Sequence, residues 1–338
     1  MVLVTGATGI LGRVIVLELL NRGKSVRASK RKDSNLNEVK ESFRFYGENP
    51  DEVFQKIEWV EVDFEDLDSL KNALNGVDEV YHCAAKVSFH PKDKKQLYQT
   101  NIKGTKQLLY ACENAEVKKF LFVSSIAVLD GLNENGELDE TSDFNPKVDH
   151  SSYAISKHFS EMEVWRASAE GMQTVVVNPG LIIGSGNWNS SSGTLFKELG
   201  EPSYTFSGGT SYVDVRDVAK ISVELMEQNI FGERFILISE NKKYQEVANF
   251  IKQKLGKPTV KIVPNGLLSI GVFLNAILGW LISHLRMANK TNVKSVTEFN
   301  KISNQKIKER LQYEFIPVEE SLNFHLENYL SKRKKNQE

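Results

Sequence analysis

Cysteine is scarce in this chain, which has 338 residues and two cysteines, Cys83 and Cys112. Neither lies in a CxxC or metal-ligand spacing, so a disulfide framework is excluded and no metal site is predicted. Both lie in apolar stretches, which predicts buried, reduced thiols. No charged and then apolar leader is predicted, because a strand is expected to begin at Val2 and to turn at Gly6. Together these features predict a cytoplasmic protein.

An excess of charge is missing as well. The 43 basic and 44 acidic residues leave a formal net charge of -1, so no global field draws the protein to nucleic acid or to an anionic membrane. We find no internal repeat, and low complexity is confined to residues 331–338, which we expect to form a solvated tail. The expected partner is a small-molecule substrate, with the protein a monomer or a homodimer.

What the chain does have is a regular alternation of short apolar runs and helical patterns, with an apolar fraction of 41%. This alternation predicts an α/β fold: a Rossmann-type, doubly wound parallel sheet with helices on both faces. The expected strands lie at 2–5, 25–29, 57–62, 79–83, 119–124, 174–178 and 235–239. The expected helices lie at 10–22, 67–75 and 94–114, and residues 38–57 are expected to be a long linker.

The pattern loosens after Pro179 and predicts a second, smaller lobe. Residues 184–211 are rich in Gly, Ser and Asn and are expected to be loops, and the stretch after 240 is expected to be mostly helical. We therefore predict a dinucleotide-binding domain at 1–183 plus about 212–240. The substrate-binding lobe is expected at 184–211 plus about 241–330.

Residues 266–285 carry no Asp, Glu, Lys or Arg. The stretch is long enough to span a bilayer, but polar residues and glycines interrupt it. We expect an apolar helix packed on the second lobe. Peripheral membrane contact and a true span are the competing interpretations.

The segment VLVTGATGILG predicts a phosphate-binding turn between the first strand and the first helix. Gly6 permits the sharp turn, Gly9 clears room for a pyrophosphate, and Gly12 allows the helix to pack closely on the strand. The anion would rest on free N–H groups at the helix N-terminus. The whole turn, with Thr8, Ile10 and Leu11, is expected to contact a nicotinamide dinucleotide.

Lys30, Arg31 and Lys32 follow the second strand, where NAD-binding proteins usually place an acid. Arg31 and Lys32 would pair with a 2′-phosphate, so we expect NADP rather than NAD. Asp63 follows the third strand, beside Phe64, and is placed to accept a hydrogen bond from the adenine amino group.

Tyr153 and Lys157 stand four residues apart at the start of a helical pattern, on one face. The lysine is expected to lower the phenol pKa, so that Tyr153 acts as a general acid or base, and to reach the nicotinamide ribose. Ser125 ends the fifth strand and would polarise a substrate carbonyl, with Ser124 as the competing candidate. Asn101 is expected to hold a water behind Lys157.

TGATGILG, HCAA, NIKGT, VSSIAV, YAISK, NPGLIIG and YVDVRDVA follow in this order over about the first 220 residues. This ordered set resembles the extended branch of the short-chain dehydrogenase/reductase superfamily, the NAD-dependent epimerase/dehydratase family. The resemblance implies Ser125, Tyr153 and Lys157 as a catalytic triad supported by Asn101. It also implies that Ala84, Ala85 and the backbone around Pro179 and Gly180 flank the cofactor. Lys86, Phe89 and Tyr212 are expected to contact substrate, whereas His90 is expected to be a loop histidine.

Two groups of that branch, the sugar epimerases and the dehydratases, carry motifs that this chain lacks. Sugar epimerases typically show a basic-aromatic-Asn run where this chain has VVVNPGLIIG. Dehydratases carry Thr-Asp-Glu where this chain has Ser125-Ile126-Ala127, so the acid pair for eliminating water is missing. The stretches VRASKR and NPGLIIG resemble dihydroflavonol and cinnamoyl-CoA reductases and, more loosely, 3β-hydroxysteroid dehydrogenases. We therefore predict an NADP-dependent oxidoreductase acting on a carbonyl or secondary alcohol. The competing hypotheses are an NDP-sugar epimerase holding NAD, a sterol or lipid dehydrogenase, and a silent dinucleotide sensor.

Overall fold

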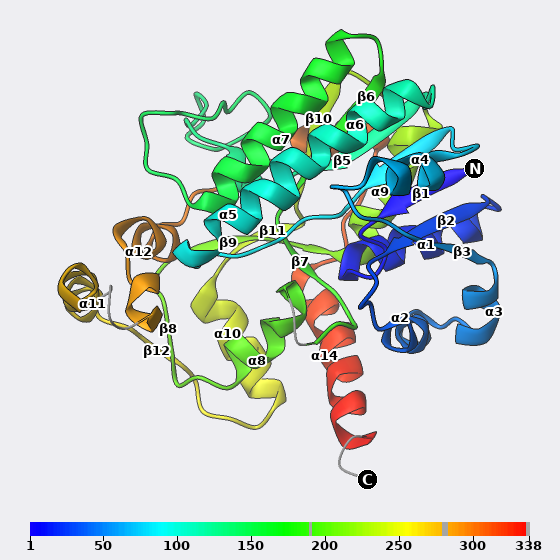
Figure 1. The fold of residues 1–338 in the computed structure, drawn as a ribbon. Coiled ribbons are helices and arrows are strands. Elements are labelled where there is room, and N and C mark those ends of the chain that lie inside the picture. The colour runs from blue at the N-terminus through cyan, green and yellow to red at the C-terminus, as the bar shows by residue number, and fades with distance from the viewer. Residues whose placement is uncertain (189–190, 279–282, 336–338) are drawn as a thin grey trace.

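The computed structural model describes residues 1–188, 191–278 and 283–335, and within them seven parallel strands form one sheet (Figure 1). The strand order is β10-β6-β5-β4-β1-β2-β3, and each neighbouring pair is parallel. The strands are β1 (Val2–Thr5), β2 (Val26–Lys30), β3 (Ile57–Glu61), β4 (Glu79–His82), β5 (Lys119–Val123), β6 (Gln173–Pro179) and β10 (Glu233–Leu237). The predicted doubly wound parallel sheet is confirmed, and its order reverses between β1 and β4.

The sheet is buried on both faces, which explains why its strands lack a polar alternation. In β1, Val2 and Val4 belong to one hydrophobic core and Leu3 to the other. In β5, Leu121 joins the first core, while Phe120 and Phe122 join the second. Successive side chains therefore enter different apolar layers, as expected for a sheet covered by helices on either side.

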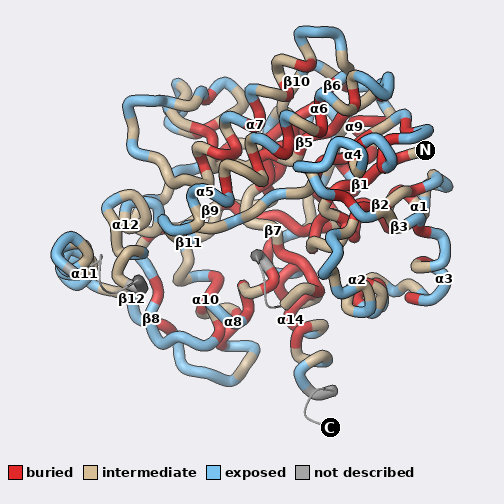
Figure 2. The backbone as a smooth tube through the Cα atoms, viewed as in Figure 1, coloured by how far each residue is buried: buried red, intermediate tan, exposed pale blue. Residues whose placement is uncertain are grey.

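The first core lies under α1 (Ile10–Asn21) and α9 (Val215–Glu227), which pack against each other. The second core lies under α4 (Leu67–Leu74), α6 (Gly104–Asn114) and α7 (Ser152–Ala169). Figure 2 shows the resulting band of buried backbone through the sheet and its nearest helices.

The helix predicted at 94–114 contains a change of winding. It begins as α5 (Lys94–Leu97), passes through the π-helical segment η3 (Tyr98–Lys103) and continues as α6. Asn101 lies inside the π-helical segment. Such segments often occur at functional sites, because they turn a side chain away from the regular helix face.

Two stretches expected to lack regular structure contain it. The predicted linker at 38–57 holds parts of α2 (Leu36–Ser42) and β3, with η1 (Phe43–Tyr46) and α3 (Pro50–Gln55) between them. Asn35 caps α2 by accepting a bond from the Glu38 N–H, and Asn49 caps α3, which starts at Pro50. These are ordinary helix-start signals, so the linker prediction was wrong for a reason readable in the sequence.

A third core joins the smaller elements. Its sheet has the order β11-β9-β7, and its residues come from both sides of the predicted domain boundary at 240. The elements around it are β7 (Leu181–Ile183), η5 (Ser191–Thr194), α8 (Leu195–Gly200), β9 (Gly209–Asp214), β11 (Glu240–Lys243), α10 (Tyr244–Lys254) and α14 (Val318–Lys335). The expectation of loops over 184–211 was therefore wrong, because α8 and the start of β9 lie there. Helix α14 also runs through the described part of the predicted tail, 331–335.

The other elements are short or peripheral. They are η2 (Pro91–Asp93), η4 (Ile126–Val128), β8 (Tyr204–Thr205), β12 (Lys261–Ile262), α11 (Asn265–Leu278), η6 (Ser283–Met287), α12 (Lys290–Thr297) and α13 (Gln305–Leu311). Helix α11 lies at the outer edge of the molecule beyond α12 (Figure 1).

The structure contradicts the expectation that residues 266–285 form a helix packed on the second lobe. In the described part, α11 leaves Leu267 58%, Ile270 54% and Phe273 63% exposed, and residues 279–282 lie outside the described chain. Among the helices of the described ranges, none combines the length and the apolar character that crossing a bilayer requires.

Candidate functional site

The glycine turn lies where the sheet order reverses, at the carboxyl ends of β1 and β4. Gly6 has a φ of +67°, and a Cβ there would lie 2.6 Å from the backbone nitrogen of Ala84. A Cβ on Gly12 would lie 2.2 Å from the carbonyl oxygen of Gly6. Only glycine fits at either position, so the first turn of α1 is held close to the strand. Its N-terminal N–H groups thus form a cradle that fits a pyrophosphate.

A buried arginine, Arg13, stabilises the backbone of this turn through hydrogen bonds. The Arg13 side chain is fully buried and donates to the carbonyl oxygens of Thr8 and Gly9 at 2.5 and 3.1 Å. Its other bonds reach both carboxylate oxygens of Glu38 on α2 at 2.9 Å. Burial alone would raise the pKa of Glu38, but the Arg13 bonds outweigh it and hold that pKa below its usual value. Sequence reasoning missed this pair, although an arginine inside ILGRVIV was a visible signal.

The predicted 2′-phosphate site lies beside the turn. The Gly6 N–H donates to the Ser29 hydroxyl oxygen at 3.2 Å, so the end of β2 abuts the glycine turn. Arg31 and Lys32 follow directly and are exposed, with the Arg31 guanidinium 3.9 Å from Asp33. Exposed cations at this position suit a phosphate dianion better than a ribose hydroxyl.

The other expected cofactor contacts lie at the same carboxyl edge of the sheet. Asp63 is exposed just after β3, and Phe64 packs on His82 with ring centroids 5.7 Å apart. Ala84 and Ala85 follow β4, and Pro179 ends β6. Gly180 is tightly enclosed, since a Cβ there would lie 2.4 Å from the Ser211 carbonyl oxygen.

Tyr153 and Lys157 lie one turn apart on α7, whose start Ser151 caps by accepting a bond from the Ala154 N–H. The Lys157 ammonium donates to the carbonyl oxygen of Val123, at the end of β5, at 2.6 Å. The Ser125 side chain lies near the Tyr153 hydroxyl and acts to lower its pKa. The Ser124 hydroxyl points elsewhere and donates to Glu161 at 2.6 Å. Of the two candidate serines, Ser125 is the one that meets Tyr153.

The pKa pattern differs from the expected one. Burial raises the pKa of Tyr153 above its ordinary value, and the neighbouring Ser125 side chain only opposes this. Burial lowers the pKa of Lys157 to about 7, against the opposing charge of Glu161. The expectation that Lys157 lowers the pKa of the Tyr153 phenol was wrong. The Lys157 amine is partly neutral at pH 7, and it donates to the Val123 carbonyl. Tyr153 is thus a protonated phenol at neutral pH, suited to donate a proton.

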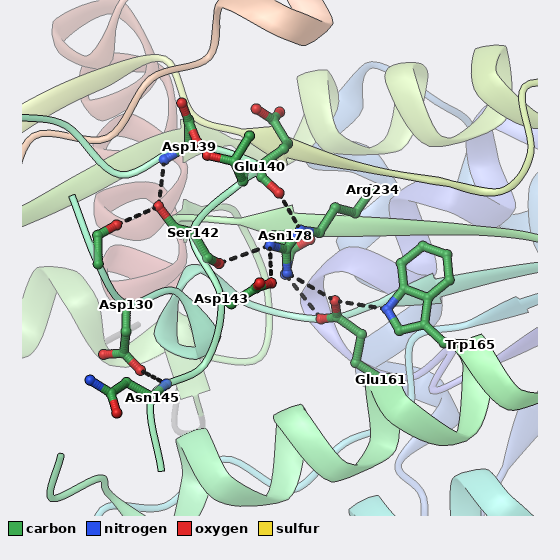
Figure 3. Close-up of polar contacts among 12 residues, drawn as sticks. Asp130, Asp139, Glu140, Ser142, Asp143, Asn145, Glu161, Trp165, Asn178 and Arg234 are labelled. Atoms are coloured by element: carbon green, nitrogen blue, oxygen red, sulfur yellow. Dashed lines mark hydrogen bonds and ion pairs between the residues drawn. The ribbon is translucent and has the colours of Figure 1, made fainter. Parts of the chain in front are cut away.

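Glu161 is a functional candidate that sequence reasoning missed. This buried carboxylate lies one turn after Lys157 on α7, and Figure 3 shows it between Trp165 and the side chains of Asn178 and Arg234. Besides Ser124, its oxygens accept bonds from Asn178 at 3.2 Å and Trp165 at 3.3 Å, and Arg234 lies 3.5 Å away. The spacing of four residues from Lys157 could have revealed it. Its charge raises the pKa of Lys157 against burial.

Asn101 ties α7 to the loop after β4. Its side-chain N–H group donates to the Ser156 hydroxyl at 2.8 Å and to the Lys86 carbonyl at 3.0 Å, and its oxygen accepts from the Lys86 N–H at 2.8 Å. The Ser160 hydroxyl donates to the Asn101 carbonyl at 2.7 Å. Asn101 thus positions both α7 and Lys86. Its expected role in holding a water stays a prediction.

The expected substrate residues divide into two groups. Phe89 is 48% exposed, and its ring meets the Tyr153 ring edge-on at 5.7 Å. Lys86 lies in the same loop, where His90 caps η2. Tyr212 lies apart from them: it is fully buried on β9 in the third core, and its hydroxyl has no hydrogen-bond partner among the described residues.

Comparisons with known proteins agree with this geometry. The model of the NAD dependent epimerase/dehydratase family matches residues 2–237. The chain is 29% identical to sterol demethylase protein B of Methylococcus capsulatus, over 77% of this chain and 76% of that protein. It is 31% identical to cinnamoyl-CoA reductase 1 of Petunia hybrida, over 70% and 71%. The solved structure of gox2253 is 26% identical, has a TM-score of 0.82 and is matched over 98% of both chains.

Proposed function

The chain belongs to the NAD dependent epimerase/dehydratase family, and from this premise we propose that it reduces a carbonyl group, or oxidises the secondary alcohol, with NADP as its cofactor. As a member of that family it is an NAD(P)-dependent oxidoreductase of the dihydroflavonol-reductase-like group. One observation carries the proposal: Tyr153 and Lys157 stand one turn apart on α7, with Lys157 bonded to the end of β5, at the carboxyl edge of the sheet that also holds the glycine turn.

The chemistry divides between the cofactor and the chain. When bound, the nicotinamide ring supplies or accepts a hydride. The glycine turn would hold the pyrophosphate, and Lys157 would reach the nicotinamide ribose. Ser125 then polarises the substrate carbonyl oxygen, and Tyr153 delivers a proton to that oxygen as it becomes an alkoxide.

The preference for NADP rests on the end of β2. Arg31 and Lys32 place two cations beside the glycine turn, and the first acid after them is Asp33. A carboxylate at this position would repel a 2′-phosphate, whereas a guanidinium can bind it through two parallel bonds. The basic pair therefore favours NADP over NAD.

A sterol or lipid alcohol is a second candidate substrate. The exposed Phe89 ring beside Tyr153 gives the mouth of the site an apolar wall. The similarity to a protein named sterol demethylase protein B supports the same class. A sugar epimerase has less support, because it would need a polar mouth. A silent sensor also has less support, because it would not need the intact pair Tyr153 and Lys157.

Cofactor consumption tests the proposal. Purified protein is mixed with NADPH or NADH and a panel of ketones, aldehydes, CoA thioesters, 3-ketosteroids and NDP-sugars, and the loss of absorbance is followed. We expect net oxidation of NADPH with a carbonyl substrate. The double variant Arg31→Ala, Lys32→Ala should raise KM for NADPH roughly tenfold or more and leave KM for NADH nearly unchanged. Tightly retained NAD, with NDP-sugar turnover and no net consumption, would instead identify an epimerase.

A further inference from the structure

Helix α11 leaves a stripe of large apolar side chains exposed to solvent. Leu267, Ile270, Phe273, Leu274 and Ile277 recur at spacings of three and four, so they share one face, and each is at least 38% exposed. Gly271 lies beside this stripe, and an added Cβ there would lie 3.5 Å from the Ala288 side chain. The helix is thus half-buried along Leu268, Gly271, Val272 and Asn275 and presents its other large apolar residues to solvent.

The chain around α11 has a strong local charge that the overall balance conceals. Between Glu246 and Glu298 there is no acidic residue, while seven lysines and arginines occur. Lys261 on β12 and Lys290 at the start of α12 bracket the helix, and both are exposed. An apolar stripe flanked by cations is complementary to a lipid bilayer, which has an apolar interior and, with anionic lipids, a negatively charged surface.

That charge disfavours a second copy of the chain as the occupant. A two-fold interface buries the same patch of both subunits against itself. The cations that flank α11 would then meet their own copies, and the segment from 247 to 297 offers no carboxylate to separate them. A bilayer with anionic lipids presents the opposite charge, together with an apolar layer for Leu267, Ile270 and Phe273.

The geometry points to α11 as a membrane-docking helix, which lies in the interface of an anionic phospholipid bilayer with its apolar stripe inserted and Lys261 and Lys290 at the headgroups. The apolar residues bind the acyl boundary, and the lysines select anionic lipid. The helix is peripheral and does not cross the bilayer, in agreement with its length of 14 residues. This inference is independent of the catalytic proposal.

Vesicle sedimentation of the full chain tests it. We compare vesicles of phosphatidylcholine alone with vesicles that also contain phosphatidylglycerol. The protein should sediment with the anionic vesicles, and added salt should weaken that binding. The triple variant Leu267→Ser, Ile270→Ser, Phe273→Ser should lose binding more than tenfold, and Lys261→Ala with Lys290→Ala about twenty-five-fold, since each lysine contributes roughly fivefold near an anionic surface.

A matched control separates docking from general stickiness. Leu67 on α4 is 66% exposed, comparable to Leu267, and Leu67→Ser should bind vesicles as the parent protein does. Thermal melting must show that the triple variant is folded; if it is not, Phe273→Ser alone replaces it. Failure of the parent protein to bind anionic vesicles would overturn the inference. So would undiminished binding by the variant, or a dimer in solution that the variant dissociates without any vesicle binding.

Discussion

Helices α1 and α11 are both built mainly from apolar residues, yet they occupy opposite environments. In α1, Val14, Ile15 and Leu19 are at most 5% exposed and lie in the first core against α9 and the sheet. In α11, Leu267 and Phe273 are more than half exposed. Apolar composition alone therefore does not decide burial. The neighbours in sequence do: α1 lies between two buried strands, whereas α11 lies between exposed lysines.

Glycine has a different role in each helix. Gly12 allows α1 to approach the turn after β1, where the space is too small for a Cβ. A Cβ added to Gly271 would meet the Ala288 side chain at ordinary contact distance, so the place of α11 does not require a glycine there. One glycine belongs to the cofactor cradle and the other to a peripheral helix, so substitutions in the two helices should have very different effects.

The sharpest contrast comes from removing one leucine side chain from each helix. Leu19→Ala removes a fully buried side chain and should lower the free energy of unfolding by about 2–5 kcal/mol. Leu267→Ala removes an exposed one and should change it by less than about 0.5 kcal/mol. Denaturant unfolding of both variants measures the difference. Equal losses would mean that α11 is packed in solution and that the comparison fails.

The glycine pair gives a smaller contrast with opposite signs. Gly12→Ala forces α1 away from Gly6 and should cost about 1–3 kcal/mol and weaken NADPH binding. Gly271→Ala has space and sits inside a helix, so it should be neutral or stabilise by up to about 1 kcal/mol. Thermal melts with and without NADPH measure both effects. Normal NADPH affinity in Gly12→Ala would contradict the close-packed cradle.

The smallest expected contrast between the Rossmann sheet and α11 is in how the stability of the protein depends on pH. His82 is buried at the end of β4 between Thr5 and Thr105, at 2.7 and 2.9 Å, and burial, with nearby Lys157, lowers its pKa from 6.5 to about 3. Below pH 6.5 the unfolded chain takes up a proton that the folded chain does not. The stability that neutral His82 contributes above pH 6.5 is therefore lost progressively as the pH falls toward 3.

The measurement is the melting temperature as the pH falls from 7 to 5, in the parent protein and in His82→Gln. The variant should show a shallower decline. Helix α11 carries no titratable side chain, so Phe273→Ser should leave the slope unchanged. Identical slopes in the parent protein and in His82→Gln would show that His82 does not cause the loss of stability at low pH.

The sequence predicted the central sheet well because its signals are local. The run Val2-Leu3-Val4 followed by Gly6 specifies a buried strand and a turn with no outside information, and the ends of the predicted sheet strands agree with the structure to within two residues. The Ser125 and Tyr153 pair was also accessible, because both residues lie in short ordered motifs.

What the sequence could not provide depends on contacts across the fold. The π-helical winding at Asn101 is stabilised by Ser160, which lies far along the chain on α7. The partial neutralisation of Lys157 comes from burial by surrounding elements, which no spacing records. The misjudged placement of α11 has the same origin, since its apolar pattern is equally compatible with a core and with a membrane.

The measurement that tests the central claim most directly is the comparison of Tyr153→Phe with the parent protein, by turnover and by NADPH titration in parallel. The substitution removes the hydroxyl that we propose as the proton donor and keeps the ring that packs on Phe89. We predict that turnover falls by at least about a hundredfold while the NADPH dissociation constant changes less than about threefold. Retained turnover would contradict the assignment of Tyr153 as the proton donor, and joint loss of turnover and binding would show that the residue is structural.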